Sequence, residues 1–511
     1  MAALQYTKIE DLAKIHERVT KSFKSGKTRS FASRKKQLLN LYKLIDENQD
    51  LICDALNKDL HKPRPEALIT EINPTKSEIA LAHSSFEKWA LPEKVSPGVA
   101  LMRDTAMIRS EPKGVVLIIG PWNYPVYLLL CPLAGAIAAG NTVILKQSEV
   151  TPHTSATITV LIQRYLDPDV VQCVNGGPEE TQELLKLRFD HIFFTGSGVI
   201  GRHIMKAAAE HLCPVTLELG GKSPCIVSKD ADLKIAAKRI AWGKLLNAGQ
   251  TCIAPDYILC EQATLGPLVD ALKESFEGFF NGKESKQSPD YGRVVNERHW
   301  DRLNSWLKES RGKIVIGGQT DRSDCFIAPT VVVDVSPNDK LMQEEIFGPL
   351  LPIITVPNMD AAIDYVNQRD QPLVCYVFGD HKFINRVADE TRSGGFVGND
   401  CLIHIAISSL PFGGVGPSGT GAYHGKASFD TFSHRRSVLV RNLNKVEEAL
   451  SKGRYPPYVP NSFMYRLTNA LLFYRLSQPS RVRKFLVPFA VVLLAAVLAV
   501  KGQALREFLK F

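Results

Sequence analysis

The sequence predicts an α/β fold in which helices cover parallel sheets. Short apolar runs rich in valine and isoleucine alternate with helix-compatible segments, and this order is typical of βαβ units. A length of 511 residues leaves room for about three structural units. Because 45% of the residues are hydrophobic, the chain can also build the cores that such units need.

The predicted elements follow one another with short turns. Residues 1–19 alternate apolar and polar side chains as an amphipathic helix does, and they lack the apolar run of a secretory signal. Strand Val115–Ile119, helix Pro132–Ala139 and strand Thr142–Leu145 form a βαβ candidate. The alternation continues with strands at 170–174, 191–194 and 215–219 and helices at 179–187 and 201–210, and segments 282–289 and 455–460 are predicted to be loop and linker.

Composition and charge exclude several classes of protein. A charged fraction of 23% beside the apolar content excludes a disordered chain. The net charge of +9 comes without a long basic block, so nucleic-acid binding is not expected. The ten cysteines form no CxxC pair and no cluster, which argues against a metal site or a disulfide framework and favours reduced thiols facing the cytosol.

The C-terminal end differs from the body of the chain. Phe485–Val500 contains no charge and is flanked by Arg481, Arg483 and Lys484 before it and Lys501 after it. A span of this length is slightly short for a bilayer, although about 17 residues suffice when basic side chains reach the interface. We therefore expect a transmembrane tail anchor at 485–501, with a buried core helix as the alternative.

A second apolar segment precedes this tail. Phe463–Tyr474 is rich in aromatic and aliphatic side chains. It could lie in the membrane interface as an amphipathic helix, or it could pack on the globular body. The sequence leaves these two interpretations open.

Three residues are candidates for catalysis. Cys252 follows a glycine-containing turn, where a thiol can face a ligand and be ionised by backbone N–H groups or a base; a buried structural cysteine is the alternative. Glu218 ends an apolar strand, so its pKa would rise and it could take a proton from water; a helix cap or an ion pair with Lys222 is the alternative. Asn123, in the loop Gly120–Pro125, could donate to an oxyanion or serve its own turn.

Two further segments suit a dinucleotide. The run from Phe194 to Gly201 leads from a strand through a glycine turn into a helix, and its small residues and N-capping Ser197 can hold a pyrophosphate. This turn is weak evidence alone, because it is not a GxGxxG motif. Lys146 and Glu149 follow a strand and suit ribose hydroxyls, with solvated surface charge as the alternative.

Together these segments resemble the class-3, fatty aldehyde dehydrogenase branch of the aldehyde dehydrogenase superfamily. The resemblance covers residues from about 5 to about 440. It rests on PWNYP, LKQSE, FTGSxxxG, LELGGKSP, NAGQTCIAPDY, EEIFGPLLP and LPFGGVGPSGTGAYHGKASFDTFSH, which occur in the family's order.

The resemblance implies a role for each candidate. Cys252 matches the nucleophile that forms a thiohemiacetal with the aldehyde, and Asn123 with the Cys252 N–H matches the oxyanion hole. Glu218 matches the base that activates water to hydrolyse the thioester left after hydride transfer. The residues that match cofactor contacts are Lys146 and Glu149 (adenosine ribose), Thr195, Gly196, Ser197 and Gly201 (diphosphate), Leu219 and Gly220, and Glu345 and Phe347 (nicotinamide ribose and ring).

The resemblance also implies the cofactor and the substrate. NAD is favoured over NADP because Glu149 would repel a 2′-phosphate, although relatives of this branch accept both. Ser197 departs from the asparagine usual in the branch. The aliphatic branch and the expected membrane tail together favour medium- to long-chain aldehydes as substrates.

An aldehyde dehydrogenase-like fold with two Rossmann-type domains is implied, together with a homodimer and a gatekeeper role for Phe463–Tyr474. The catalytic body would face the cytosol, with the anchor in the endoplasmic reticulum rather than the mitochondrial outer membrane. The expected parts are a cofactor domain (1–212), a catalytic domain (213–395), a return and oligomerisation segment (396–440), a linker with the gatekeeper helix (441–484) and the tail anchor (485–501).

Two other functions stay open on the sequence alone. A coenzyme A-acylating enzyme would pass the acyl group to a thiol, whereas the presence of Glu218 favours water. A membrane-tethered binding protein of the same fold would need no chemistry, whereas intact Cys252, Glu218 and Asn123 favour an enzyme.

Overall fold

The computed structural model describes residues 3–98, 101, 103–443, 445, 448, 452–460 and 462–472. The chain divides into two compact units. The first combines the chain up to Pro92 with Arg109–Arg436, and the second combines Glu93–Ile108 with the chain from Ser437 onward.

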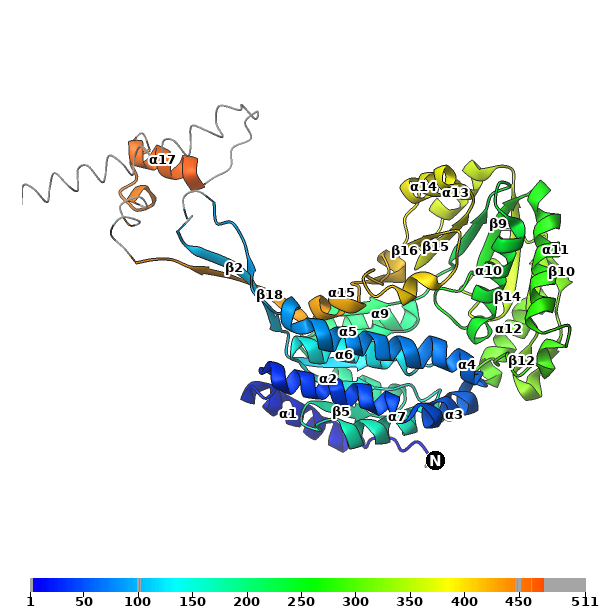
Figure 1. Ribbon diagram of the computed structural model, residues 1–511, viewed down its shortest axis with the longest axis horizontal. Helices are drawn as coiled ribbons and strands as arrows, with labels where there is room; N and C mark the ends of the chain where they lie inside the picture. Colours follow the sequence, from blue (N-terminus) through cyan, green and yellow to red (C-terminus); the bar gives the residue numbers. More distant parts are fainter. Residues whose placement is uncertain are drawn as a thin grey trace, which may run out of the picture. The chain divides into compact units, whose positions relative to one another are not determined.

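Helices make up the N-terminal part of the first unit. An amphipathic helix, α1, is present as predicted, but it begins at Ile9 and ends at Ser25 rather than spanning residues 1–19. Its buried face includes Leu12 and Val19. Contacts join α2, α5 and α6, which run alongside one another in Figure 1. The elements are α1 (Ile9–Ser25), α2 (Phe31–Asp46), α3 (Gln49–Leu60), α4 (Arg64–Ala67), the π-helical turn η1 (Leu68–Ile72) and α5 (Asn73–Trp89).

A six-stranded sheet in the order β17-β7-β6-β3-β4-β5 forms one half of the first unit. All its pairings are parallel except β17 with β7. Every residue of β3, β4 and β6 is buried, because helices cover both faces of the sheet. Its elements are β3 (Val115–Ile119), α6 (Tyr127–Ala139), β4 (Thr142–Lys146), α7 (Pro152–Tyr165), β5 (Val171–Val174), α8 (Pro178–Leu185), β6 (His191–Thr195), α9 (Gly198–Ala209), β7 (Val215–Glu218) and β17 (Gly419–Thr420).

The predicted strands of this half are confirmed to within one residue at each end, but two helices begin at least three residues earlier than predicted. Helix α9 starts at Gly198 rather than at residue 201. Helix α6 starts at Tyr127, five residues before the predicted Pro132. The Glu71 carboxylate accepts hydrogen bonds from the N–H groups of Val126 and Tyr127, both at 3.0 Å. A side chain distant in sequence therefore caps the helix, and Pro132 lies inside it.

A seven-stranded sheet in the order β10-β13-β14-β9-β8-β15-β16 forms the other half of the first unit. Its strands are parallel except β10, which is antiparallel at one edge. Its elements are β8 (Pro224–Val227), α10 (Leu233–Leu245), η3 (Leu246–Gly249), β9 (Tyr257–Glu261), α11 (Gln262–Phe279), α12 (Glu297–Glu309), β10 (Lys313–Ile316), β13 (Thr330–Val333), β14 (Leu350–Val356), α13 (Met359–Asn367), β15 (Val374–Phe378), α14 (His381–Glu390) and β16 (Gly395–Gly398).

Smaller elements complete the first unit. The hairpin strands β11 (Thr320–Asp321) and β12 (Phe326–Ile327) form a two-stranded sheet. The rest are the short helices η4 (Ser285–Gln287), η5 (Arg322–Asp324), η6 (Lys340–Met342), η7 (Ile403–Ala406), η8 (Gly416–Ser418) and α15 (Gly425–Thr431).

A three-stranded sheet in the order β1-β2-β18 continues into the second unit. It contains β1 (Glu93–Lys94), β2 (Thr105–Pro112) and β18 (Ser433–Val440), and the unit also holds η9 (Lys452–Arg454) and α17 (Phe463–Leu472). The predicted helix near Phe463 is thus present. Among the described residues no helix is both long and apolar enough to cross a bilayer, and the expected anchor at 485–501 lies outside them.

Candidate active site

The candidate residues gather where the two halves of the first unit meet. From the six-stranded sheet they come from the carboxyl ends of β3, β4, β6 and β7, which share one edge because these strands are parallel. From the other half they come from the turn before β9 and the loop before β14. No group of three or more histidine, cysteine or acidic side chains among the described residues could hold a metal ion.

Cys252 lies on a strained turn that its neighbours hold in place. Asn247, Ala248 and Gly249 have φ values of 53°, 52° and 75°, and left-handed backbone is costly for the first two. On one side of the cysteine, the Thr251 hydroxyl hydrogen-bonds the hydroxyl of Tyr124 at 2.7 Å. On the other, the Ile253 carbonyl accepts from the Tyr376 hydroxyl at 2.5 Å. These contacts fix the backbone on both sides of the thiol.

The Cys252 side chain is half-buried rather than sealed in the core. Burial raises its pKa above the usual 9.0, and the charges of Glu345 and Glu218 raise the pKa further. Cys252 also packs against the hydrophobic core, so its role as the nucleophile stays a prediction.

Asn123 faces the turn that carries Cys252. Its side-chain N–H₂ donates one hydrogen bond to the Gln250 carbonyl at 3.1 Å, which orients the amide. The main-chain carbonyl of Asn123 accepts hydrogen bonds from the side chain of Asn247 at 2.9 Å and from the Lys62 amine at 3.2 Å. The alternative of an asparagine that serves its own turn is wrong, because its partners come from other segments.

Glu218 is a buried acid without a partner. It is 3% exposed, and within the described part of the chain neither of its carboxylate oxygens has a hydrogen-bond partner. Burial raises its pKa well above 4.5. The alternatives of a cap or an ion pair with Lys222 are wrong, because Lys222 bonds Asp256 at 2.6 Å instead.

Lys222 and Asp256 form a clamp on the loop that carries Glu345. Lys222 also donates to the carbonyls of Leu341 (2.7 Å) and Glu344 (2.9 Å), and Asp256 accepts from the Ile346 N–H at 3.0 Å. The ion pair is nearly buried, with side chains 11% and 4% exposed. The loop is thereby tied to the segments that hold Glu218 and Cys252.

This clamp places Glu345 and Phe347 at the site. A Cβ on Gly220 would lie 2.1 Å from a Glu345 carboxylate oxygen, so the close approach requires glycine. Burial raises the pKa of Glu345 to about 8. Phe347 has a left-handed φ of 51° and packs edge-on against Trp122, with ring centroids 5.3 Å apart.

The turn after β6 has the features expected of a diphosphate site. Ser197 caps α9, as predicted, by accepting a hydrogen bond from the Ile200 N–H. The Thr195 hydroxyl is buried and has no partner within the described residues. A Cβ on Gly201 would lie 2.8 Å from the Leu219 side chain, so glycine lets α9 pack closely against this residue beyond β7.

Lys146 ends β4 and is 3% exposed, which makes the alternative of a solvated surface charge wrong. Its amine donates to the Gln147 carbonyl at 2.7 Å and pairs with Glu149 at 3.3 Å. Burial lowers the pKa of Lys146. The residues near β4 and β6 thus fit a dinucleotide, since they offer an orphaned hydroxyl, a capped helix N-terminus and a paired cation and anion.

Sequence reasoning missed several residues that shape the site. They are Lys62, Glu66, Glu71, Trp122, Gln250 and Asp256. Each acts on a segment far away in sequence; Trp122, Gln250 and Asp256 lie inside motifs that carry the resemblance but were given no role, and the other three lie in none of these motifs.

Comparison with known proteins agrees with this arrangement. The model of the aldehyde dehydrogenase family matches residues 1–438. The chain is 50% identical over 442 residues, 86% of its length and 90% of the relative's, to aldehyde dehydrogenase family 3 member A2 of Macaca fascicularis. It is 49% identical, over 86% of its length and 96% of the relative's, to a dimeric NADP-preferring aldehyde dehydrogenase of Rattus norvegicus.

A solved structure is similar over nearly its whole length. The substrate-bound state of AldH from Staphylococcus aureus matches with a TM-score of 0.87 and 42% identity, and the match covers 90% of this chain and 99% of that one. The chain belongs to the aldehyde dehydrogenase family, among relatives of family 3, and is an NAD- or NADP-dependent oxidoreductase that oxidises aldehydes.

Proposed function

We propose that the chain oxidises medium- to long-chain aliphatic aldehydes to carboxylic acids with NAD, through a covalent intermediate on Cys252. The observation that carries this proposal is the convergence of Cys252, Asn123 and the unpartnered Glu218 at one place in the fold. A nucleophile, an oxyanion donor and a base are the groups that this reaction needs.

In the proposed reaction the Cys252 thiol first loses its proton to solvent water, and the thiolate then attacks the carbonyl carbon of the aldehyde. One side-chain N–H of Asn123 donates to Gln250, and the second is left to donate, with the Cys252 N–H, to the oxyanion of the thiohemiacetal. The bound cofactor supplies the hydride acceptor, and a thioester remains on Cys252. Glu218 then takes a proton from water, the hydroxide attacks the thioester carbon, and the Cys252 thiolate leaves with release of the acid.

Glu218 also favours water over coenzyme A as the acyl acceptor. A buried carboxyl without a protein partner is free to hydrogen-bond a water molecule. Product formation that depends on added coenzyme A would exclude hydrolysis as the second step.

NAD preference is supported by the Glu149 carboxylate beside Lys146. A 2′-phosphate there would meet a like charge, whereas ribose hydroxyls can donate to it. The rat relative is NADP-preferring by name, and the ratio of kcat/KM for NAD to that for NADP tests the preference proposed for this chain.

The substrate class and the location are argued from the C-terminal part. We propose a tail anchor at 485–501 in the endoplasmic reticulum membrane, a cytosolic body, and a gatekeeper role for Phe463–Tyr474. The apolar tail sequence and the helix α17 with its 69% exposed Phe463 support this. The domain limits proposed are 1–212, 213–395, 396–440 and 441–484, and β7 at the start of the second range pairs with β6 of the first.

Dimer formation is also proposed. Strand β18 lies at an edge of its sheet, and Leu439 and Val440 on it are 52% and 57% exposed. An edge strand with apolar side chains can pair with another chain. A second copy of this chain would cover it.

An NADH assay over a series of aldehydes from hexanal to hexadecanal tests the proposed substrate class. It is carried out with the full chain and with a chain ending at residue 460. We expect kcat/KM to rise with chain length in the full chain and this preference to weaken in the truncated one. Equal turnover of hexanal and hexadecanal by both proteins would contradict the substrate class and the gatekeeper role.

A further inference from the structure

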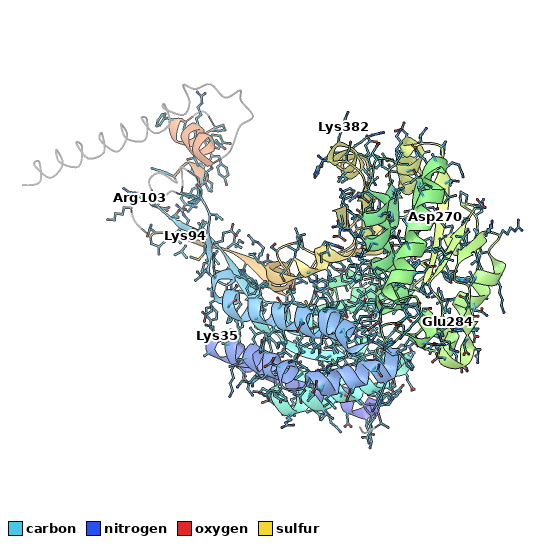
Figure 2. All side chains as sticks on the ribbon, turned by 45° about the vertical axis from the view of Figure 1, so that its right-hand side comes forward. Lys35, Lys94, Arg103, Asp270, Glu284 and Lys382 are labelled. Atoms are coloured by element: carbon cyan, nitrogen blue, oxygen red, sulfur yellow. The ribbon has the colours of Figure 1, made fainter. Side chains whose placement is uncertain are left out.

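A buried ion pair outside the predicted site adjoins the loop that carries Asn123. The Lys62 amine lies 2.6 Å from a Glu71 carboxylate oxygen, and both side chains are fully buried. Charged side chains of this kind normally lie at the surface, as Lys35 and Glu284 do in Figure 2. Replacing a buried ion pair with neutral side chains is often harmless or stabilising, so stability alone does not account for it.

The ion pair contacts the Asn123 loop at several points. Lys62 donates to the Asn123 carbonyl at 3.2 Å, and its amine lies 4.2 Å from the centre of the Tyr124 ring. The second oxygen of Glu71 accepts from the N–H groups of Val126 and Tyr127. The pair therefore holds the loop from Asn123 to the start of α6.

The same stretch of chain also holds the turn that leads to Cys252. Glu66, between Lys62 and Glu71 in sequence, accepts from the Asn247 N–H at 2.8 Å. The Asn247 side chain donates to the Asn123 carbonyl (2.9 Å) and to the Gln250 carbonyl (3.1 Å). Residues 62–71 thus bond to both loops, and the loops bond to each other through Asn123, Asn247 and Gln250.

From these contacts we propose that Lys62, held by Glu71, is a positioning residue of the oxyanion hole. It fixes the Asn123 amide relative to the Cys252 thiol, across the junction between the two halves of the first unit. A displacement of about 1 Å between such groups lowers rates about 10²-fold. This inference rests on the proposed function, because it takes Asn123 as the oxyanion donor.

The test uses the full-length protein and a double variant, Lys62→Met with Glu71→Gln. Changing Lys62 alone would leave a buried charge without a partner. Glutamine keeps an oxygen that can cap α6, so the double variant removes the charges and the contact to Asn123 without exposing the helix end. Asn247→Gly is an independent second variant, because it removes the other donor to the Asn123 carbonyl and glycine tolerates the left-handed φ of that position.

Four measurements are made on each protein. They are NADH formation from an aldehyde, hydrolysis of p-nitrophenyl acetate without cofactor, alkylation of Cys252 by iodoacetamide, and thermal unfolding. Ester hydrolysis needs the oxyanion hole but no hydride transfer, and alkylation needs the thiol but no oxyanion hole. The matched control is the exposed ion pair Lys35–Glu87, changed to Met and Gln, which should leave all four measurements unchanged.

We expect both site variants to lose about 10²-fold in kcat for aldehyde and ester, with the KM for NAD and the alkylation rate unchanged. When the same substitutions are made in the Asn123→Ala variant, they should lower its kcat by less than about threefold, because the group that the substituted residues position is already absent. Two results would overturn the positioning role of Lys62. One is an unchanged kcat in the site variants, and the other is a further loss of about 10²-fold when they are combined with Asn123→Ala.

Failure of the proposed function would be recognised separately. If the wild-type chain oxidises none of the aldehydes, the proposed substrates are wrong. The ester and alkylation measurements still decide whether Lys62 and Asn123 act together, because neither measurement uses an aldehyde or a cofactor.

Discussion

Replacing Glu218 with glutamine separates the two halves of the proposed reaction. The side chain keeps its size and stays in the same buried position, which is 3% exposed and offers no partner to either carboxylate oxygen. Only the ability to take a proton from water is lost. Attack by Cys252 and oxidation of the thiohemiacetal do not need that proton transfer, so the thioester should still form.

The expected size of the effect follows from the role of a general base. Such a group contributes about 10²–10⁴-fold to the rate of its step. Because that step is the hydrolysis, steady-state turnover of Glu218→Gln should fall by about this factor, and a rapid burst of about one NADH per active site should remain. Stopped-flow absorbance of NADH measures both phases in one experiment.

Two results would refute this reasoning. An undiminished steady-state rate would show that another group activates water. Loss of the burst together with turnover would show that Glu218 is needed before the thioester forms. Cys252→Ala is the control, because it should remove both phases.

Three further predictions address the other parts of the site. Lys222→Met leaves the buried Asp256 carboxylate unpaired and frees the Glu345 loop. In urea titrations we expect the free energy of unfolding to fall by about 3–5 kcal/mol, and in initial-rate assays we expect the KM for NAD to rise. An unchanged KM would contradict the clamp. Glu149→Gln removes the like charge that would face a 2′-phosphate. The ratio of kcat/KM for NADP to that for NAD should rise about tenfold, which corresponds to about 1.4 kcal/mol. A constant ratio would show that Glu149 does not select the cofactor. Burial and the neighbouring carboxylates raise the pKa of Cys252 above 9.0, so in the protein without cofactor the thiolate fraction should increase with pH throughout the range 7–9. The rate of Cys252 alkylation by iodoacetamide, followed by mass spectrometry, measures this fraction. An alkylation rate that stops rising below pH 8 would contradict the prediction.

Local sequence pattern was sufficient for the strands, and it marked the segments that carry the proposed catalytic residues, whose roles the family resemblance implied. Val115–Ile119 is a continuous apolar run that is buried on both faces, so composition alone marks its bounds. Cys252, Glu218 and Asn123 each stand in a segment with glycine or proline turns next to a predicted strand. Parallel strands bring the Asn123 and Glu218 segments to one edge of the six-stranded sheet, whereas the Cys252 turn comes from the other half, before β9.

The contacts between segments could not be predicted in the same way. The start of α6 depends on Glu71, which is 55 residues from Val126, and no pattern near Pro132 indicates that cap. The partner of Lys222 is Asp256 rather than the nearby Glu218, because the fold brings the later segment against it. The sequence around Lys62 is polar, so it does not predict that the side chain is buried. The proposed positioning role of Lys62 follows only from its contacts in the structure.

The central claim is that Cys252 carries the acyl group, and mapping that group tests it most directly. Glu218→Gln protein is mixed with NAD and a long-chain aldehyde, quenched with acid after the burst, and digested with trypsin. The peptide 245–273 contains both Cys252 and Cys260, so fragment ions must distinguish them. The account predicts one acyl group on Cys252; an acyl group on another residue, or NADH formation with no acylated cysteine, would contradict it.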